Sequence, residues 1–187
     1  GLRAVEGAVV VVDAVAGVQV QTEKVWKFAD EYALPRLVMV NRMDRERADF
    51  FRTIESMGKR LKGRLVPLQL PLGAEAGFKG VVDLVRMKAI LYADGKPQEE
   101  EVPGDLSGQA REYREKLIEA VAETDDDLLA KYLEEGAIDE AEMLKALRTG
   151  IAAGQIIPVL GGAATRGIGT QLLADLVASA PGRGMGR

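Results

Sequence analysis

The feature that most constrains this chain is a pair of short, uninterrupted apolar runs with a helical pattern between them. Residues 8–12 read AVVVV and residues 37–40 read LVMV. Runs of this kind are typical of strands that are buried on both faces, as in a parallel sheet. Between them, residues 19–33 place small and apolar side chains at helical spacing, up to the break at Pro35. A strand, a helix and a strand with short links predict parallel strands joined by a crossover.

The pattern changes in the middle of the chain and then returns. A second helix is expected at about 46–61, followed by short strand-like runs between Gly, Pro and Asp residues, and then by helices. A strand, a glycine-rich loop and a helix resume the first pattern. We therefore expect an α/β protein whose parallel sheet core (1–61 and 155–187) carries an inserted α+β subdomain (62–154). The later expected strands are 65–70, 80–85, 88–92 and 156–160, and the later expected helices are 108–123, 125–134, 139–152 and about 169–180.

The net charge of −4 conceals an uneven distribution. Residues 62–154 hold 12 Lys and Arg against 19 Asp and Glu, a net charge of −7, whereas the rest of the chain carries +3. An acidic segment between mildly basic flanks indicates an insert with its own surface. It also argues against that segment binding a nucleic-acid backbone directly.

The composition excludes several kinds of site. The 187 residues include no cysteine and no histidine, so disulfides, thiolate or imidazole metal ligands and a Ser-His-Asp triad are ruled out. No apolar run approaches the roughly 20 residues that a membrane-spanning helix needs. The first residues lack the apolar region of a signal peptide. We therefore expect a cytoplasmic protein that does not enter a membrane.

Two glycine-rich segments are candidate ligand loops. A Walker-type phosphate loop needs Gly-x-x-x-x-Gly-Lys-Ser/Thr, so that the lysine and the hydroxyl reach phosphate and magnesium. The segment GAEAGFKG (73–80) has its lysine before the last glycine and no hydroxyl after it, so we interpret it as a turn between strands. The segment GGAATRGIG (161–169) also lacks the Lys-Ser/Thr pair. However, it comes after a strand and leads into a helix, where backbone N–H groups can contact a ligand.

Some charged and aromatic residues have simple structural interpretations. Asp139 with Glu142, and Thr124 with Asp127, have the spacing of helix N-termini. The run of aspartates at 125–127 fits capping better than metal binding, because consecutive side chains point in different directions. Trp26 fits packing inside a helical layer better than stacking on a ligand.

Three charged segments remain. Glu99 to Glu101 are interpreted as a solvated charge run. The basic stretch of Lys59, Arg60, Lys62 and Arg64 is either a helix end that obeys the helix dipole or a contact for an anionic partner. The ending PGRGMGR (181–187) reads as a tail or linker.

An amide and a carboxylate come after the second apolar run. Asn41 stands at the end of the expected strand, and Asp44 comes three residues later. One interpretation is helix capping, because Asn and Asp side chains accept hydrogen bonds from the first turn of a helix. The other is a ligand site at the carboxyl edge of a parallel sheet, where open α/β folds bind their ligands.

The chemistry of this segment matches guanine. The two oxygens of the Asp44 carboxylate can accept two parallel hydrogen bonds, and guanine offers N1–H and the N2 amine as a matching pair. Adenine has neither donor and would leave the carboxylate unpaired. Asn41 can hold the edge of the base or tie neighbouring loops together. The aliphatic stem of Arg42 can lie over the purine face while its charged head stays in water.

With these residues in view, the sequence resembles translational GTPases. Asn41-Arg42-Met43-Asp44 resembles their Asn-Lys-x-Asp guanine motif, and four longer segments resemble bacterial elongation factor G in the expected order. Those segments are DAVAGVQVQTEKVW (13–26), VNRMDRERADFFRT (40–53), QLPLGAEAGFKGVVDLVRMKA (69–89) and EAVAETDDDLLAKYLEEG (119–136). The similarity covers about residues 1–180, and segment 69–89 is similar to the insert that marks elongation factor G among its relatives.

The resemblance implies a partial P-loop GTPase-type core that binds GTP or GDP, with Mg²⁺ in the complete domain. In that family, the stretch PVLGGAAT (158–165) falls on a loop that usually reads Gly-Ser-Ala and contacts guanine O6 through backbone N–H. Here Ala163 stands where serine is usual, and Arg42 stands where lysine is usual. The residues expected to contact the nucleotide are Asn41, Arg42, Met43, Asp44, Ala163 and Ala164.

No segment resembles the family's phosphate loop, its first switch or its magnesium-binding Asp-Thr-Pro-Gly-His element, and residues 1–14 resemble the segment after that element. The expectation is therefore a fragment that reads guanine but holds no catalytic or metal-ligating residue. The implied parent activity is GTP hydrolysis coupled to ribosomal translocation. The implied partners are the ribosome and its stalk protein, and the protein is expected to be a monomer. A stalk-binding module and a paralogous recycling or ribosome-protection GTPase are the alternatives.

Overall fold

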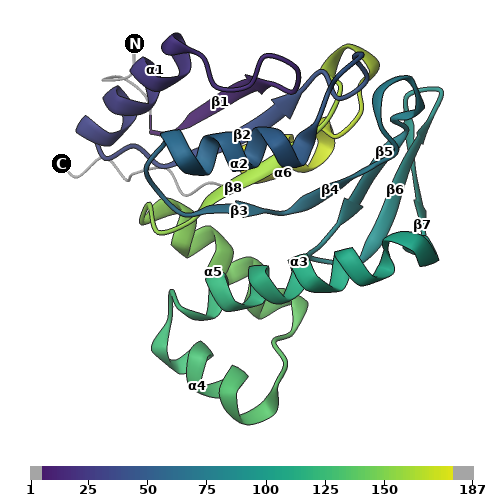
Figure 1. Ribbon diagram of the computed structural model, residues 1–187. Helices are drawn as coiled ribbons and strands as arrows, with labels where there is room; N and C mark the ends of the chain where they lie inside the picture. Colours follow the sequence, from purple (N-terminus) through teal and green to yellow (C-terminus); the bar gives the residue numbers. More distant parts are fainter. Residues whose placement is uncertain (1–5, 179–187) are drawn as a thin grey trace.

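The computed structural model describes residues 6–178, and its core is a four-stranded parallel sheet (Figure 1). The strands are β1 (Ala8–Asp13), β2 (Arg36–Asn41), β8 (Ile157–Gly161) and β3 (Leu65–Pro67). They lie in the order β1-β2-β8-β3, and every neighbouring pair is parallel. β2 and β8 are the strands with the most complete burial, because each lies between two others and is covered on both faces. This arrangement confirms the predicted α/β class.

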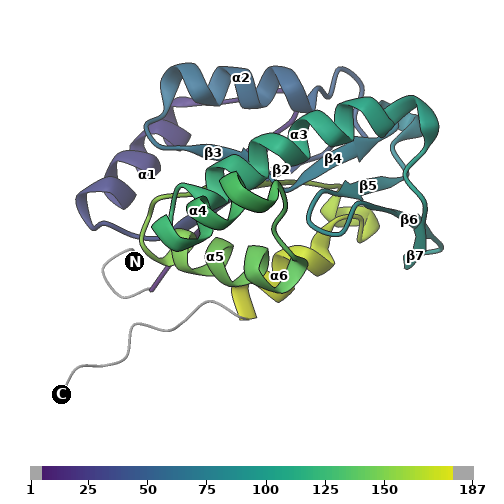
Figure 2. The ribbon, with the colours of Figure 1, turned by 90° about the horizontal axis from the view of Figure 1, so that it is seen from below.

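Helices cover both faces of this sheet. α2 (Phe50–Arg60) lies over one face and α6 (Thr170–Ala178) over the other (Figure 2). α1 (Val20–Glu31) is held to the end of α2 by Trp26, which is buried and whose indole Nε1–H donates to the Lys62 carbonyl at 2.8 Å. The packing interpretation of Trp26 is therefore confirmed.

Helix α2 begins later than the sequence pattern suggests. The pattern predicts a start near residue 46, but Arg47 has a positive φ of 65°, which ends any helical run through it. The helix starts at Phe50, and Asp49 is its N-cap, accepting from Arg52 N–H at 2.9 Å.

A second, antiparallel sheet begins one residue, Leu68, after the core strand β3. We call it the insert sheet, and its strand order is β4-β5-β6-β7. The segment 73–80 is a turn between β4 and β5, as predicted, and contains the short 3₁₀ helix η2 (Glu75–Gly77).

Strand β7 was not predicted, because its charged residues were interpreted as a solvated charge run. Its side chains are indeed exposed, and the strand exists because it pairs along its length with β6. The four strands are β4 (Gln69–Leu72), β5 (Gly80–Asp83), β6 (Lys88–Ala93) and β7 (Lys96–Glu100).

Three helices complete the middle of the chain: α3 (Gly104–Ala122), α4 (Asp126–Glu135) and α5 (Glu140–Ala152). The predicted capping box of Asp139 and Glu142 starts α5. The prediction for α4 was wrong by one residue: Asp125 is the N-cap and accepts from two backbone N–H groups. The Thr124 hydroxyl instead donates to the Val121 carbonyl at the end of α3.

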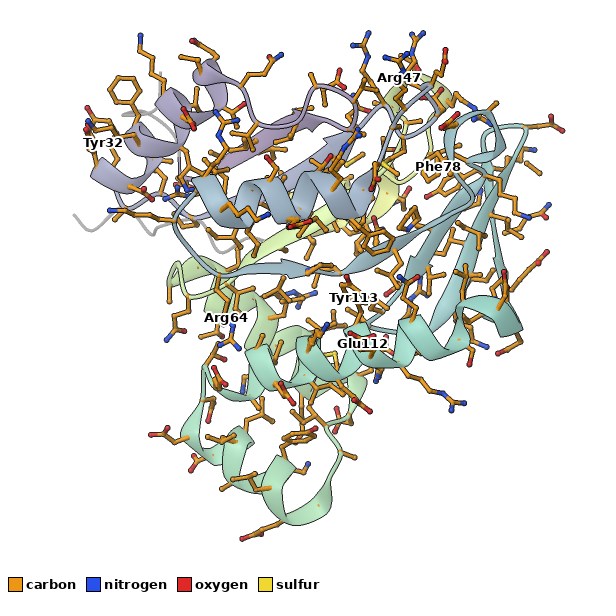
Figure 3. The ribbon with its side chains drawn as sticks, in the orientation of Figure 1. Tyr32, Arg47, Arg64, Phe78, Glu112 and Tyr113 are labelled. Atoms are coloured by element: carbon orange, nitrogen blue, oxygen red, sulfur yellow. The ribbon has the colours of Figure 1, made fainter. Side chains whose placement is uncertain are left out.

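The middle of the chain is fastened to the core. β3 falls within residues 62–154, yet it pairs with β8 in the core sheet. The rings of Phe51 on α2 and Tyr113 on α3 lie 5.8 Å apart, and Arg64 forms an ion pair with Glu123 (Figure 3). One apolar cluster runs through both regions. The division of the chain into a core (1–61 and 155–187) and an inserted subdomain (62–154) stays a prediction.

No helix within residues 6–178 is both long and apolar enough to cross a bilayer. The tail PGRGMGR (181–187) and the last two residues of the helix expected at 169–180 lie outside the described residues.

Candidate guanine-recognition site

The carboxyl ends of three parallel strands meet at one edge of the core sheet. Asp13 at the end of β1 lies opposite Asn41 at the end of β2. Val40 of β2 lies opposite Gly161 at the end of β8. The β2–α2 turn and the loop 161–169, which we call the β8–α6 loop, therefore leave the sheet side by side. This is the edge at which open α/β sheets bind ligands.

Asn41 ties these two connections together. Its side-chain Oδ1 accepts a hydrogen bond from the Ala164 N–H at 2.9 Å. Two backbone bonds reinforce the contact: Met43 N–H donates to the Gly162 carbonyl at 3.1 Å, and Gly162 N–H donates to the Val40 carbonyl at 2.9 Å. Of the two roles considered for Asn41, the structure shows the tie between neighbouring loops.

Arg42 has a left-handed backbone with φ of 65°. Its guanidinium forms an ion pair with Asp13, with Nη1 and Oδ2 2.8 Å apart. The head of Arg42 is therefore paired with a carboxylate and does not simply stay in water. The arginine side chain is about half exposed (55%), so it lies along the outer rim of this edge.

Asp13 is a well-supported anion. Burial by itself raises the pKa of this carboxyl, but hydrogen bonds from Arg42 and from the N–H groups of Val15 and Ala16 outweigh it and lower the pKa below the usual value. The same carboxylate thus orders the turn after β1 and holds Arg42.

Asp44 lies in the β2–α2 turn and is partly exposed. Since α2 begins at Phe50 with Asp49 as its cap, the capping interpretation of Asp44 is wrong. Among residues 6–178, no donor forms a hydrogen bond or an ion pair with the Asp44 carboxylate. Met43, its neighbour, is buried and serves as packing. Asp44 thus keeps both carboxylate oxygens available at the carboxyl edge.

Ala163 and Ala164 use their backbone donors within the protein. Ala163 N–H donates to the Ile168 carbonyl at 3.1 Å, in a short antiparallel bridge across the β8–α6 loop. Ala164 N–H donates to Asn41, and Ala164 itself is exposed. Thr165 N–H, the next donor along the loop, has no acceptor in the described part of the chain. At the exposed tip of this loop, Thr165 N–H is therefore the backbone donor that no acceptor within residues 6–178 occupies.

The β8–α6 loop can be this tight only because of its glycines. A Cβ on Gly162 would lie 2.3 Å from the Ile168 carbonyl oxygen, and one on Gly169 would lie 2.3 Å from the Gly161 carbonyl oxygen. Gly169 also has a positive φ of 79°, which glycine adopts without a steric penalty. The glycine-rich composition that marked this loop in the sequence thus has a packing cause.

Residues of the insert sheet also hold this loop, and sequence reasoning missed them. The buried amide of Gln69 accepts from Gly161 N–H at 3.3 Å. Arg166 in the loop donates from Nη1 to the Phe78 carbonyl at 3.0 Å. Burial raises the pKa of the Tyr92 hydroxyl on β6, and the nearby Gly169 N–H offsets part of that rise. Only Gln69 carried a local signal, as a polar residue within an apolar strand run.

The other candidate segments do not form a second site. In the basic stretch, three of the four side chains pair with acidic residues: Lys59 with Glu55, Arg60 with Glu23 and Arg64 with Glu123. This favours the structural interpretation of that stretch. Within residues 6–178, no group of three or more acidic side chains is arranged to hold a metal ion.

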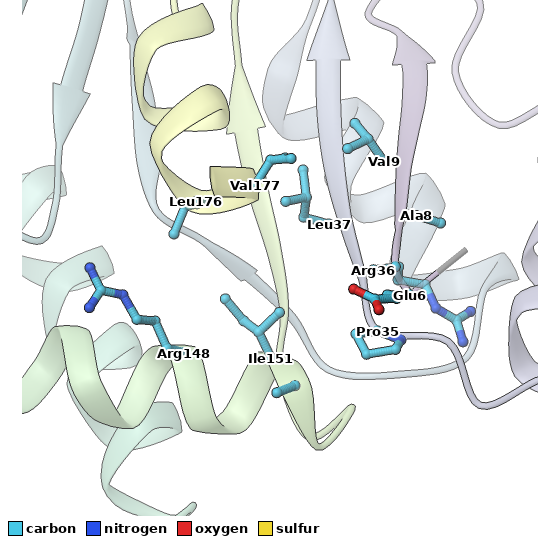
Figure 4. A pocket seen from close by; sticks show the side chains of 12 residues that line it. Glu6, Ala8, Val9, Pro35, Arg36, Leu37, Arg148, Ile151, Leu176 and Val177 are labelled. Atoms are coloured by element: carbon cyan, nitrogen blue, oxygen red, sulfur yellow. The ribbon is translucent and has the colours of Figure 1, made fainter. Parts of the chain in front are cut away.

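A groove of about 300 Å³ lies at the opposite edge of the sheet (Figure 4). Its walls come from the first residues of β1 and β2 and from α5 and α6, with Arg148 and Ile151 facing Leu176 and Val177. The amino ends of parallel strands are not where α/β folds bind ligands, and none of the predicted site residues lines this groove.

Comparison with known proteins agrees with this geometry. The family model described as the elongation factor Tu GTP binding domain matches residues 1–181. A crystal structure of a protein from Thermus thermophilus superposes with a TM-score of 0.87 at 35% sequence identity. The match covers 96% of this chain and 27% of the Thermus chain, so this chain spans about a quarter of that protein's length. The chain belongs to the family of elongation factor Tu GTP binding domains.

Proposed function

We propose that this chain carries the base-recognition half of a guanine-nucleotide site in a translational GTPase. The observation that carries the proposal is the free carboxylate of Asp44 beside the tie between Asn41 and Ala164. A carboxylate held at the carboxyl edge of a parallel sheet, with no partner among the described residues, matches the paired N1–H and N2 donors of guanine.

Each site residue has a distinct part in this proposal. Asp44 accepts from the guanine N1–H and N2 amine. The Thr165 N–H, at the exposed tip of the β8–α6 loop, supplies a backbone donor for O6. Asn41 holds that tip next to the β2–α2 turn. Arg42, fixed at the rim by Asp13, provides an aliphatic stem for the face of the purine.

We expect the proposed site to bind the guanine base but not to catalyse GTP hydrolysis. The 187 residues contain no Gly-x-x-x-x-Gly-Lys-Ser/Thr phosphate loop and no histidine, so the phosphates of GTP have no recognisable partner here. We expect this chain alone to bind GDP with a Kd of roughly 1 mM or weaker, a free energy of about −4 kcal/mol. We expect no hydrolysis of GTP above the background rate.

The finer assignment rests on the resemblance to elongation factor G. Residues 69–100 form the insert sheet and residues 104–152 form α3, α4 and α5, and segment 69–89 is the part that resembles the insert of that factor. We propose that the complete protein is a cytoplasmic, monomeric factor that binds the ribosome and couples GTP hydrolysis, with Mg²⁺, to translocation. A recycling or ribosome-protection GTPase is the alternative within the same family.

The decisive test is the preference of Asp44→Asn for xanthine over guanine. The amide replaces one acceptor with a donor, which faces the N2 amine of guanine but suits the oxygen that xanthine carries at that position. NMR titrations with GDP and XDP should show that the unmodified chain prefers GDP and that Asp44→Asn prefers XDP. Asp49→Asn is the matched control, because it removes a nearby charge and preserves the cap. An unchanged ratio in Asp44→Asn would refute base recognition by this residue.

The exposed surface of helix α4 favours a second function, which is the binding of a partner protein. Helix α4 buries none of its residues, and Leu133 on it is 75% exposed. The helix is acidic and projects away from the core sheet (Figure 1), so its exposed face is accessible to a partner protein. We propose that this face contacts the ribosomal stalk protein. Titration with that protein should be weakened by Leu133→Asp and not by Val20→Asp, which changes an equally exposed residue on α1.

A further inference from the structure

The β8–α6 loop is held from two opposite sides. On one side, Asn41 of the core sheet accepts from Ala164 N–H. On the other, Arg166 of the loop donates to the Phe78 carbonyl in the first turn of the insert sheet at 3.0 Å, and the Gln69 side chain of β4 accepts from Gly161 N–H at 3.3 Å. Figure 3 shows Phe78 at the same end of the molecule as the carboxyl edge of the core strands.

The bonds inside the loop do not fix its position relative to Asp44. The bridge between Ala163 and Ile168 and the turn of η3 (Ala164–Arg166) set its internal shape. They would persist if the whole loop tilted as a unit. The contacts that prevent such a tilt are those made with residues outside the loop.

The insert-sheet contacts are suited to this task. The Phe78 side chain is fully buried, so the carbonyl that accepts from Arg166 belongs to a firmly placed residue. The Gln69 side chain is buried as well, so its bond to Gly161 N–H is shielded from water. Gly169 closes the loop at the start of α6, where its Cα hydrogens lie against the Gly161 carbonyl.

We propose that the insert sheet positions the β8–α6 loop for recognition of guanine O6, with Arg166 as a positioning residue. The proposal rests on the proposed function of the carboxyl edge. Hydrogen bonds weaken steeply with distance and angle, so a small tilt of the loop removes the donor for O6. The same tilt leaves Asp44 in place, because Asp44 belongs to the β2–α2 turn. The insert is thereby linked to nucleotide specificity, in addition to any partner that it binds.

Two nucleotide analogues separate these contributions. In 6-thio-GDP, sulfur replaces O6 and accepts hydrogen bonds only weakly, while N1–H and the N2 amine are kept. In IDP, O6 and N1–H are kept and the N2 amine is missing. The GDP to 6-thio-GDP affinity ratio therefore reports on the loop, and the GDP to IDP ratio reports on Asp44.

The experiment compares two variants of the full chain by NMR titration. Arg166→Ala removes the bond to Phe78, and Arg111→Ala on α3 makes the same chemical change in another element. We expect Arg166→Ala to lower the GDP to 6-thio-GDP ratio by roughly 2- to 10-fold and to leave the GDP to IDP ratio unchanged. The Arg111→Ala control should change neither ratio.

Two outcomes would overturn the proposal: an unchanged GDP to 6-thio-GDP ratio, or an equal fall in both ratios, which indicates a general loss of structure. If the unmodified chain distinguishes neither analogue from GDP, the proposed function of the edge has failed. Amide hydrogen exchange at Ala164 then decides the positioning role. Exchange should be faster in Arg166→Ala than in Arg111→Ala, and equal exchange would refute it.

Discussion

The Asn41 side chain accepts a hydrogen bond from the Ala164 backbone at 2.9 Å, across 123 residues of sequence. The bond joins the exits of β2 and β8, which are adjacent strands of the core sheet. An amide at a strand exit thus acts first as a tie between two loops, and the geometry of the proposed guanine site depends on that tie.

Removal of this tie should loosen the β8–α6 loop. We expect Asn41→Ala to lower the free energy of unfolding by about 0.5–1.5 kcal/mol and to speed up hydrogen exchange at the Ala164 amide. Asn41→Asp keeps an oxygen acceptor and should protect that amide nearly as well. Urea denaturation and NMR-detected exchange measure the two effects. Equal exchange at Ala164 in both variants would contradict the role of the Asn41 oxygen.

The two aspartates between β2 and α2 should differ in their effect on stability. Asp49 caps α2, so Asp49→Ala should lower the free energy of unfolding by about 1 kcal/mol. Asp44 forms no hydrogen bond or ion pair in the described part of the chain, so Asp44→Ala should change stability by less than about 0.5 kcal/mol. Urea denaturation of both variants checks the order, and a larger loss for Asp44→Ala would contradict the structure.

The ion pair of Asp13 and Arg42 should make the folding stability depend on pH in the acidic range. The pKa of Asp13 is lowered in the folded chain from the ordinary value of 3.8, so the folded state favours the charged form. Its contribution to stability is fully present above that ordinary value and is lost as the pH falls through the lower, folded-state pKa. Asp13→Asn removes this contribution and should flatten the acid limb of a plot of urea midpoint against pH. An acid limb of unchanged slope would contradict the assignment.

Two glycines of the β8–α6 loop, Gly167 and Gly169, test how closely its backbone segments approach each other. Gly167→Ala places a Cβ where nothing lies within 4 Å, but at a positive φ of 67°, so it should cost about 1–2 kcal/mol through backbone strain alone. Gly169→Ala adds a clash with the Gly161 carbonyl oxygen to a similar strain, and should cost clearly more. Thermal and urea unfolding of the pair measure the difference. Equal losses would show that the close approach at Gly169 is relieved without cost.

The sequence was most informative where structure depends on neighbours along the chain. The apolar runs at 8–12 and 37–40 became the buried strands β1 and β2, because continuous burial on two faces leaves a pattern that local reading detects. The capping box of Asp139 and Glu142 was likewise found at the start of α5. The glycine-rich segment 161–169 was correctly placed between a strand and a helix.

Errors arose where a tertiary contact outweighed the local pattern. Strand β7 is charged and exposed, and only its pairing with β6 makes it a strand. Helix α2 starts at Phe50 because Arg47 adopts a positive φ in the compact turn before Asp49, which periodicity from residue 46 does not reveal.

By itself, the sequence determined the parallel α/β core, the strand exit at Asn41 and Asp44, and the loop that would face it. Tertiary structure decided which polar groups meet there: Asn41 with Ala164, Arg42 with Asp13, and Arg166 with Phe78. The physical reason is that strands and helix starts are set by hydrogen bonds and burial within a few residues of sequence. A site at a sheet edge is assembled by strand order, which brings residues more than 100 positions apart into contact.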